Sequence, residues 1–151
     1  MSTTAKTFDL RSGIRAGALV AMLERVMRIE LSNLLAPIGM TYPQFSALMA
    51  LYHSGPISSA ELARVLIMTR QSASEMIKQM ESAGWVIRKP DPGHKKRRLI
   101  SITGKGESVL QQADSAAMSV ENRMLGKQSA DQRDRLLQQL HECLAALGEP
   151  H

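Results

Sequence analysis

The pattern of hydrophobic and polar positions predicts helices over most of the chain. Between residues 14 and 36, apolar side chains recur three or four positions apart, as they do along one face of a helix. These side chains are Leu19, Met22, Leu23, Val26, Ile29 and Leu34. Pro37 and Gly39 are helix-ending residues, so the first helix should finish just before them.

A second helix is expected over roughly residues 42–53. Thr41 and Gln44 have the spacing of a capping box, in which each side chain accepts a hydrogen bond from the other residue's backbone N–H. The apolar positions that we expect this helix to bury are Phe45, Leu48, Met49 and Tyr52. Gly55-Pro56 then breaks the helix.

Two further helices are predicted next, separated by a tight turn. Ser58 and Glu61 form another capping box and open the first helix, whereas Thr69 can cap the second, which ends near Gly84. The buried face of the second helix is marked by apolar residues at spacings of four and three, Ala73, Ile77 and Met80. Two short helices joined in this way predict a helix-turn-helix.

The periodicity then changes to that of a β-hairpin. Residues 85–88 and 99–102 are short runs rich in β-branched side chains, and residues 90–93 between them have the turn sequence Pro-Asp-Pro-Gly. The basic run HKKRR, residues 94–98, is therefore expected at the tip of the hairpin and the start of its return strand.

The last third of the chain is again predicted to be helical, with two apolar stripes. The first stripe contains Val109, Leu110, Ala113, Ala116, Ala117, Val120 and Met124. A capping box formed by Ser129 and Gln132 opens the second, which contains Leu136, Leu140, Leu144 and Leu147. A small core cannot cover these faces together with that of residues 14–36. A partner subunit is the simplest cover, and two-fold dimers are the commonest arrangement.

The positive charge of the chain is concentrated in the predicted hairpin. The 151 residues carry a formal net charge of +5, and residues 86–98 alone contribute +5, because six cations stand there against Asp91. Such a local basic patch is typical of an element that binds a polyanion. The alternative interpretations of HKKRR are a solvated loop and a localisation signal.

Three segments, in this order and at these separations, resemble the multiple antibiotic resistance regulator (MarR) family of winged helix-turn-helix repressors. They are LLAPIGMTYPQFSALMAL, SSAELARVLIMTRQSASEMIKQMESAGWVIRKPDP and LISITGKGESVL. The resemblance covers nearly the whole chain. It implies a mainly α fold with a small β-hairpin wing, in a single domain over residues 1–151. Residues 10–37 and 104–148 would be dimerisation helices, and residues 41–103 the DNA-binding lobe.

The predicted wing departs from the family pattern, which usually reads Asp-x-Arg with the arginine six residues before a Leu-Thr pair. Counting back from Ile102-Thr103, His94 takes the place of the aspartate and Lys96 that of the arginine. Lysine is a point charge, whereas arginine is a planar fork. We therefore expect weaker reading of minor-groove shape and a similar attraction to the DNA backbone.

DNA-facing side chains are expected on the second helix of the helix-turn-helix and on the wing. Gln71 can pair with adenine and Arg70 with guanine or a phosphate, while the nearby hydroxyls suit phosphate contact. Glu75 repels phosphate but can accept a hydrogen bond from cytosine. The expected set is Thr69, Arg70, Gln71, Ser72, Ser74, Lys78, Lys95, Lys96, Arg97 and Arg98. The alternative is a solvent-facing helix with mixed polar residues.

The resemblance further implies that a small effector, often aromatic or phenolic, binds between the dimer helices and the DNA-binding lobe and lowers DNA affinity. Candidate lining residues are Met22, Arg25, Phe45, Met49 and His53. Arg25 could hold a carboxylate, whereas core packing is the alternative for the methionines and Phe45. The single cysteine, Cys143, is expected to be a buried small residue, with a symmetric contact across a dimer as the alternative.

No enzyme is predicted. The four histidines lack the context of known hydrolase or metalloprotease motifs, and there is no glycine loop to cradle phosphates. We therefore expect no catalytic residue, cofactor or metal. The longest apolar run, residues 16–23, is too short to span a bilayer, and a lone cysteine suits a reducing compartment. These features predict a cytoplasmic protein that has no membrane partner.

The sequence thus predicts a homodimeric regulator that binds a pseudo-palindromic operator in double-stranded DNA, as a repressor released by a small ligand. One alternative is a non-specific, architectural or RNA-binding protein. It is disfavoured because only 3% of the residues are aromatic, and binders of single strands stack bases on aromatic side chains. The other is a ligand-binding module without DNA binding, which the concentrated wing charge disfavours.

Overall fold

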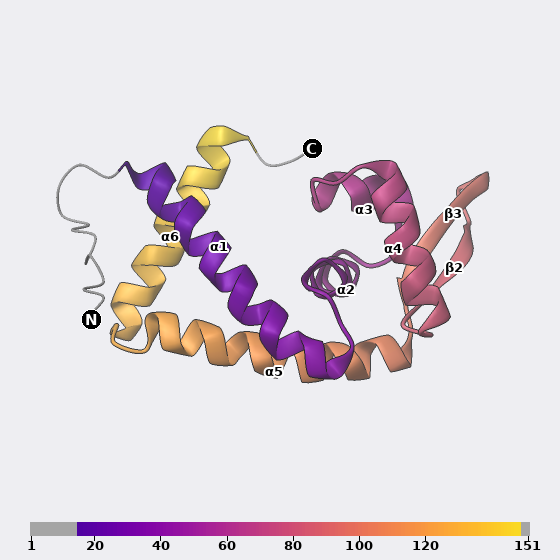
Figure 1. Cartoon of the computed structure of the whole chain (residues 1–151). Helices are drawn as coiled ribbons and strands as arrows, with labels where there is room; N and C mark the ends of the chain where they lie inside the picture. Colours follow the sequence, from indigo (N-terminus) through magenta and orange to yellow (C-terminus); the bar gives the residue numbers. More distant parts are fainter. Residues whose placement is uncertain (1–14, 149–151) are drawn as a thin grey trace, which may run out of the picture.

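The computed structural model describes residues 15–148, apart from the side chain of Lys95, and contains mainly helices with a small antiparallel sheet. Helix α5 runs along the lower side of the molecule in Figure 1, and the β-hairpin projects beyond its end. This helix connects an end formed by α1 and α6 to an end formed by α3, α4 and the β-hairpin. In chain order the elements are α1 (Ala16–Leu35), the 3-10 turn η1 (Ala36–Ile38), α2 (Tyr42–Ser54), β1 (Ile57–Ser58), α3 (Ser59–Val65), α4 (Arg70–Ser82), β2 (Val86–Asp91), β3 (His94–Ile102), α5 (Gly104–Leu125) and α6 (Ala130–Leu147).

All three predicted capping boxes are confirmed, at the starts of α2, α3 and α6. In the first, Gln44 Oε1 accepts from the backbone N–H of Thr41 at 2.9 Å, and Thr41 Oγ1 accepts from that of Gln44 at 3.4 Å. The same Gln44 side chain is buried and donates to Gln79 of α4 at 3.2 Å. The cap of α2 therefore also fixes the position of α4.

The predicted hairpin is present, but it is longer than the pattern indicated. The sheet order is β1-β3-β2, and the whole HKKRR run lies within β3. Pro90 is tolerated in β2 because that strand is at the edge of the sheet, where a missing N–H breaks no bond of an inner ladder. The third strand, β1, was not predicted because two residues carry no readable alternation.

Within the described residues, one hydrophobic cluster joins the C-terminal end of α1 with α2, α3, α4, the sheet and α5. Its most deeply buried large side chains are Leu35, Leu48, Leu51, Leu62, Ile77, Met80 and Ile100. The predicted buried face of the second helix of the helix-turn-helix is confirmed. The expectation that Tyr52 is buried was wrong, because its side chain is 59% exposed. The buried face of α2 continues through Leu51, so the next residue, Tyr52, points away from the core.

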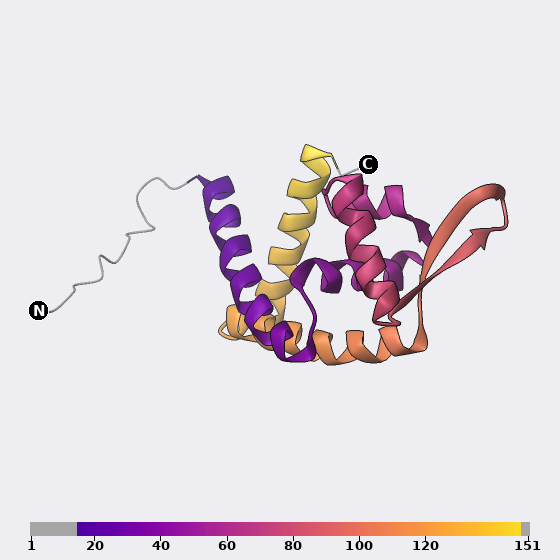
Figure 2. The same ribbon diagram turned by 45° about the vertical axis from the view of Figure 1, so that its right-hand side comes forward.

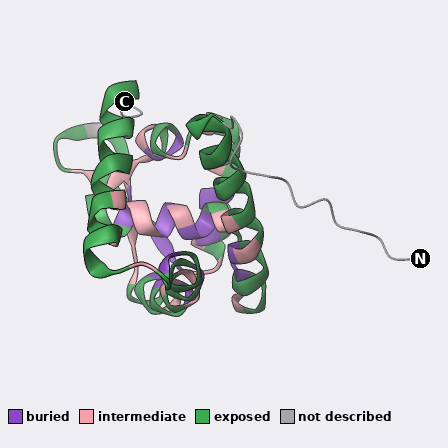
Figure 3. Ribbon diagram, turned by 90° about the vertical axis from the view of Figure 1, so that its left-hand side faces the viewer, coloured by how far each residue is buried: buried purple, intermediate pink, exposed green. Residues whose placement is uncertain are grey.

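The two outer helices carry apolar side chains that nothing in the described chain covers. Helix α6 has no buried residue and α1 has two, near its C-terminal end, and both helices are exposed along most of their length in Figure 3. The large exposed apolar residues on them are Leu19, Val20, Met22, Leu23, Val26, Ile29, Leu34, Leu137, Leu140, Leu144 and Leu147. Cys143 is also exposed, contrary to its expected burial, because it belongs to this uncovered helix.

Within residues 15–148, no single helix is long and apolar enough to cross a membrane. The segments Ala16–Ile38 and Tyr42–Ser54 have the length and apolar composition of a membrane span only when taken together, and they are bent by 87° relative to each other.

Ile67, in the turn between α3 and α4, has a left-handed backbone with φ of 51° and is 82% exposed. A β-branched residue is strained in this region, by about 1–2 kcal/mol, and an exposed side chain gains little packing in return. We expect Ile67→Gly to raise the free energy of unfolding by about 1 kcal/mol, after the entropy cost of glycine is subtracted. Urea denaturation measures this change. Ile67→Val is the control, because it keeps the strain. A glycine variant no more stable than the valine variant would contradict this account.

Candidate nucleic-acid interface

Helix α4 presents one buried and one exposed face. Ala73, Met76, Ile77 and Met80 pack into the core, and Thr69 caps the helix by accepting from the N–H of Ser72 at 3.1 Å. On the opposite face the expected DNA-facing residues are exposed, apart from Ser74, which is half-buried. That exposed set is Thr69, Arg70, Gln71, Ser72 and Lys78. The start of a helix with short hydroxyls and unbonded N–H groups suits contact with phosphate.

Gln71 and Glu75 lie one turn apart on this exposed face. The Gln71 amide donates to a Glu75 carboxylate oxygen at 3.5 Å, which is a long and weak bond. Both side chains therefore stay available to an external partner. A carboxylate there disfavours phosphate and favours a hydrogen-bond donor such as the amino group of a base.

The wing, defined as β2 and β3 with the turn between them, projects from the body beside α4 (Figures 1 and 2). His94, Lys96, Arg97 and Arg98 are exposed on it, whereas the side chain of Lys95 is outside the described part of the chain. The wing and the exposed face of α4 belong to the same lobe, so one duplex could contact both.

Two of the wing arginines are engaged within the protein. Arg97 Nη2 lies 2.6 Å from Glu61 Oε2, and Arg97 Nε lies 3.5 Å from Asp91 Oδ2. Arg88 Nε lies 3.1 Å from Glu81 Oε2, in ion-pair range but without a well-directed hydrogen bond. Among the described side chains of the wing, Lys89, Lys96 and Arg98 form no ion pair, so these cations remain available to a polyanion.

Glu61 accepts several hydrogen bonds at once. Its Oε2 accepts from the Ser58 hydroxyl at 2.6 Å, from the Ser58 backbone N–H at 2.8 Å and from Arg97 at 2.6 Å. These bonds, those of Ser58 first and that of Arg97 next, lower the pKa of Glu61 to about 2. The carboxylate is therefore ionised throughout the physiological range.

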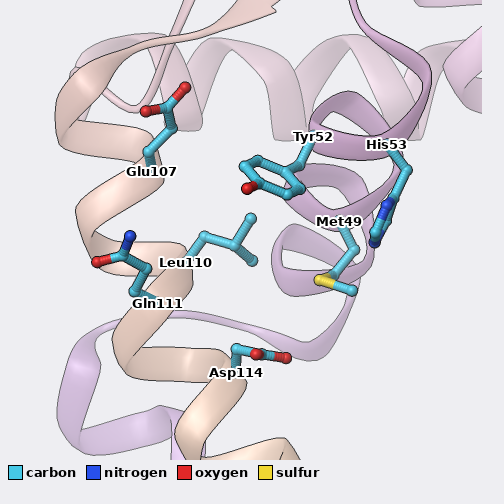
Figure 4. A pocket seen from close by; sticks show the side chains of 7 residues that line it. All are labelled: Met49, Tyr52, His53, Glu107, Leu110, Gln111 and Asp114. Carbon is cyan, nitrogen blue, oxygen red and sulfur yellow. The ribbon is translucent and has the colours of Figure 1, made fainter.

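A shallow pocket of about 170 Å³ lies between α2 and α5 (Figure 4). Met49 and Leu110 provide apolar surface, while Tyr52 and His53 meet edge to face with ring centroids 5.5 Å apart. The complete lining is Met49, Tyr52, His53, Glu107, Leu110, Gln111 and Asp114. A pocket with an apolar wall and several polar groups suits a small organic molecule.

Of the five predicted pocket residues, the structure brings Met49 and His53 together in this pocket. Phe45 lies in the buried core, and Met22 and Arg25 are exposed on α1. Sequence reasoning missed the α5 half of the lining. The apolar stripe of α5 identified which residues face inward, but no signal in the sequence indicated which polar neighbours face α2.

The fold and the exposed face of α4 with its basic wing define a winged helix-turn-helix protein. The model of the family described as the MarR family matches residues 38–97. The chain is 31% identical over 127 residues to the HTH-type transcriptional repressor Rv2887 of Mycobacterium tuberculosis, which covers 82% of this chain and 91% of the relative. The chain belongs to the MarR family. Members of this family are transcriptional regulators, not enzymes.

Solved structures agree with this assignment. Apo MarR from Escherichia coli superimposes with a TM-score of 0.77 at 25% identity, covering 87% of this chain and 98% of that one. Rv2887 in complex with DNA superimposes with a TM-score of 0.73 at 28% identity, covering 87% and 98%. Rv2887 in complex with salicylic acid superimposes with a TM-score of 0.72 at 28% identity, covering 89% of this chain and 99% of that one. The predicted family and winged helix-turn-helix fold are confirmed.

Proposed function

We propose that this protein is a homodimeric, sequence-specific, DNA-binding transcriptional regulator, acting in the cytoplasm as a repressor that a small aromatic or phenolic ligand releases. The observation that carries the proposal is the common placement of the exposed polar face of α4 and the basic wing in one lobe. A recognition helix inserts into the major groove with its N-terminal residues towards the bases, and a wing follows the backbone. E. coli MarR and Rv2887 have both been crystallised with DNA.

Within this proposal, the residues of α4 and the wing divide by role. Arg70 and Gln71 read base edges, and Lys78, Lys96 and Arg98 approach phosphates. The hydroxyls of Thr69, Ser72 and Ser74 contact the backbone near the start of α4. Lys95 keeps the phosphate role expected from the sequence.

Dimerisation is supported by the apolar faces of α1 and α6. Exposed apolar patches of this extent mark interaction surfaces in soluble proteins. We assign residues 104–148 and 10–37 to dimerisation, of which residues 10–14 lie outside the described chain, and residues 41–103 to the DNA-binding lobe. A two-fold dimer presents two recognition helices about one turn of DNA apart, roughly 10 base pairs, and so requires a pseudo-palindromic site.

A ligand site is supported by the pocket between α2 and α5, because it joins a helix of the DNA-binding lobe to a helix of the dimer region. If α2 and α5 are arranged differently in the DNA-bound and free proteins, a ligand between them would bind one arrangement more tightly than the other. Such a difference in ligand affinity is the condition for changing DNA affinity. Rv2887 has been crystallised with salicylic acid and with p-aminosalicylic acid.

The experiment that tests the proposed function is a selection from random duplex DNA at moderate salt, with the enriched pool bound again across a salt series. An enriched inverted repeat is the expected result. Salt-sensitive binding without enrichment would assign the protein to architectural DNA binding, and no binding would leave ligand recognition as its activity.

Lys96→Ala and Gln71→Ala are expected to weaken DNA binding in different ways. Loss of a phosphate contact makes the negative slope of log K against log salt less steep by about 0.9, and it affects all sequences equally. Loss of a bidentate base contact costs about 1–3 kcal/mol on the selected site and almost nothing on random DNA. Each variant serves as the control for the other when affinities on both duplexes are measured. An unchanged salt slope in Lys96→Ala would contradict the proposal that the wing contacts the DNA backbone.

A further inference from the structure

We propose that Glu61, Arg97 and Asp91 form a clamp that fixes the wing to helix α3, so that Arg97 supports DNA binding as a positioning residue and not as a phosphate contact. The proposal rests on the proposed function, because it concerns how the DNA-binding lobe is held in shape. It changes the role of Arg97, which the charge pattern alone groups with the other wing cations.

The clamp links three elements through one guanidinium group. Arg97 on β3 bonds Glu61 of α3 through Nη2 at 2.6 Å and lies 3.5 Å from Asp91, at the end of β2, through Nε. Asp91 in turn accepts from the backbone N–H of Gly93 at 2.8 Å and so closes the hairpin turn. The Asp91 side chain is only 15% exposed, which places this end of the clamp out of bulk water.

The clamp lies where the strand ladder of the wing is interrupted. Pro90 pairs with Arg98, but the next residue, Asp91, pairs with His94, so that residues 95–97 have no partner on β2. Backbone pairing cannot fix this bulge. Side-chain bonds from Arg97 therefore set its shape, and they also set the position of Lys96, the adjacent cation proposed to approach a phosphate.

The charge of Glu61 is not needed to cap its helix. The other two capping boxes within residues 15–148 use glutamine at the same position, Gln44 and Gln132, whose Oε1 atoms accept the cap bonds at 2.8–2.9 Å. Glu61 makes the equivalent bond to Ser58 at 2.8 Å. Beyond the cap bond and the bond from the Ser58 hydroxyl, its carboxylate adds the ion pair with Arg97, 36 residues away. The arrangement thus separates a capping role, which glutamine fulfils, from a clamping role, which requires the charge.

The clamp and simple electrostatics predict opposite effects for Glu61→Gln. Removal of a carboxylate from a DNA-binding lobe should strengthen its attraction to phosphates. If the carboxylate holds Arg97, its neutralisation should instead loosen the wing and weaken binding. Since glutamine keeps the helix cap, the fold of α3 is preserved in this variant.

The test measures affinity for the selected duplex with the full-length protein and its Glu61→Gln, Arg97→Ala and doubly substituted variants. We expect each single substitution to weaken binding about tenfold, and the double substitution to weaken it no further, because both break one interaction. Amide hydrogen exchange in residues 90–98, measured without DNA, should accelerate in both single variants. Glu121→Gln, which neutralises an exposed carboxylate of α5, is the matched control for charge and should leave both readouts unchanged.

Three results would overturn the clamp. Glu61→Gln could bind as tightly as the unmodified protein or more tightly, the loss from Arg97→Ala could persist in full in the Glu61→Gln background, or exchange in residues 90–98 could stay unchanged. The last readout needs no DNA, so it decides the clamp even if the selection enriches nothing and the proposed function fails. Arg97→Ala removes no capping group, and it keeps the exchange test decisive if Glu61→Gln folds poorly.

Discussion

Gly106→Ala is expected to destabilise the protein by about 3 kcal/mol, the upper part of the range for overpacking a filled site. Gly106 is buried in the first turn of α5, against the start of β2. A Cβ atom there would lie 2.1 Å from the backbone oxygen of Trp85 and 2.8 Å from Cγ1 of Ile102. The first contact is with backbone, so relief requires α5 and the sheet to move apart.

The same movement would break the cap of α5. The backbone oxygen of Trp85 accepts from the N–H of Thr103 at 2.9 Å, and Thr103 Oγ1 accepts from the N–H of Gly106 at 3.0 Å. The Thr103 hydroxyl donates mainly to the backbone oxygen of Gly84 at 2.6 Å, with that of Trp85 at 3.1 Å. Displacement of Trp85 therefore weakens the junction between the wing and α5. This coupling is the reason that one added methyl group should have so large an effect.

Urea denaturation of Gly106→Ala beside Gly104→Ala measures this effect. Gly104 lies in the same turn, but a Cβ atom there meets nothing within 4 Å, so its substitution should change stability by no more than about 0.5 kcal/mol. Equal stabilities of the two variants would show that the close approach of α5 to the sheet is not required.

The parts of the fold that the sequence predicted are those governed by local physics. Each capping box joins residues three positions apart, as Ser129 and Gln132 do, so the motif can be read without knowing the tertiary structure. The division of α4 into buried and exposed faces follows from the helical repeat. The exposed set on α4 could therefore be listed from the sequence alone.

The parts that the sequence did not predict depend on contacts between distant elements. Counting charge over residues 86–98 treats all cations alike, and it cannot indicate that Glu61 from α3 lies beside Arg97. The exposure of Tyr52 and the contribution of Asp114 to the pocket depend on the angle at which α2 packs against α5. Periodicity identifies a face of a helix but not the partner that the face meets.

Leu144→Glu is expected to convert the protein to a monomer at micromolar concentration and to lower its affinity for the selected site at least 100-fold. Leu144 is 53% exposed on α6, in line with Leu140 and Leu147. Burial of a leucine contributes about 1.5–3 kcal/mol, and burial of an unpaired carboxylate costs more. In a two-fold dimer each substitution is present twice, so the interface loses about 4 kcal/mol or more, equivalent to about 1,000-fold in dimer affinity.

Sedimentation or light scattering measures the oligomeric state, and circular dichroism checks the helices. The matched control is Ala145→Glu, which adds the same charge at the next position of α6, turned about 100° away from Leu144. The DNA-binding lobe should stay folded in both variants, because no residue of α6 is buried in the described chain.

The combination of the two readouts decides what the apolar face of α6 is for. One outcome is a folded, monomeric Leu144→Glu variant that no longer binds the selected duplex, beside a dimeric Ala145→Glu variant that still binds it. This outcome would show that the apolar face of α6 forms the dimer and that DNA binding requires both subunits. A Leu144→Glu variant that stays dimeric and binds DNA would show that α6 is not the main dimer contact. The apolar face of α1 would then be the next surface to substitute, because it carries most of the other exposed large apolar side chains at this end of the described structure.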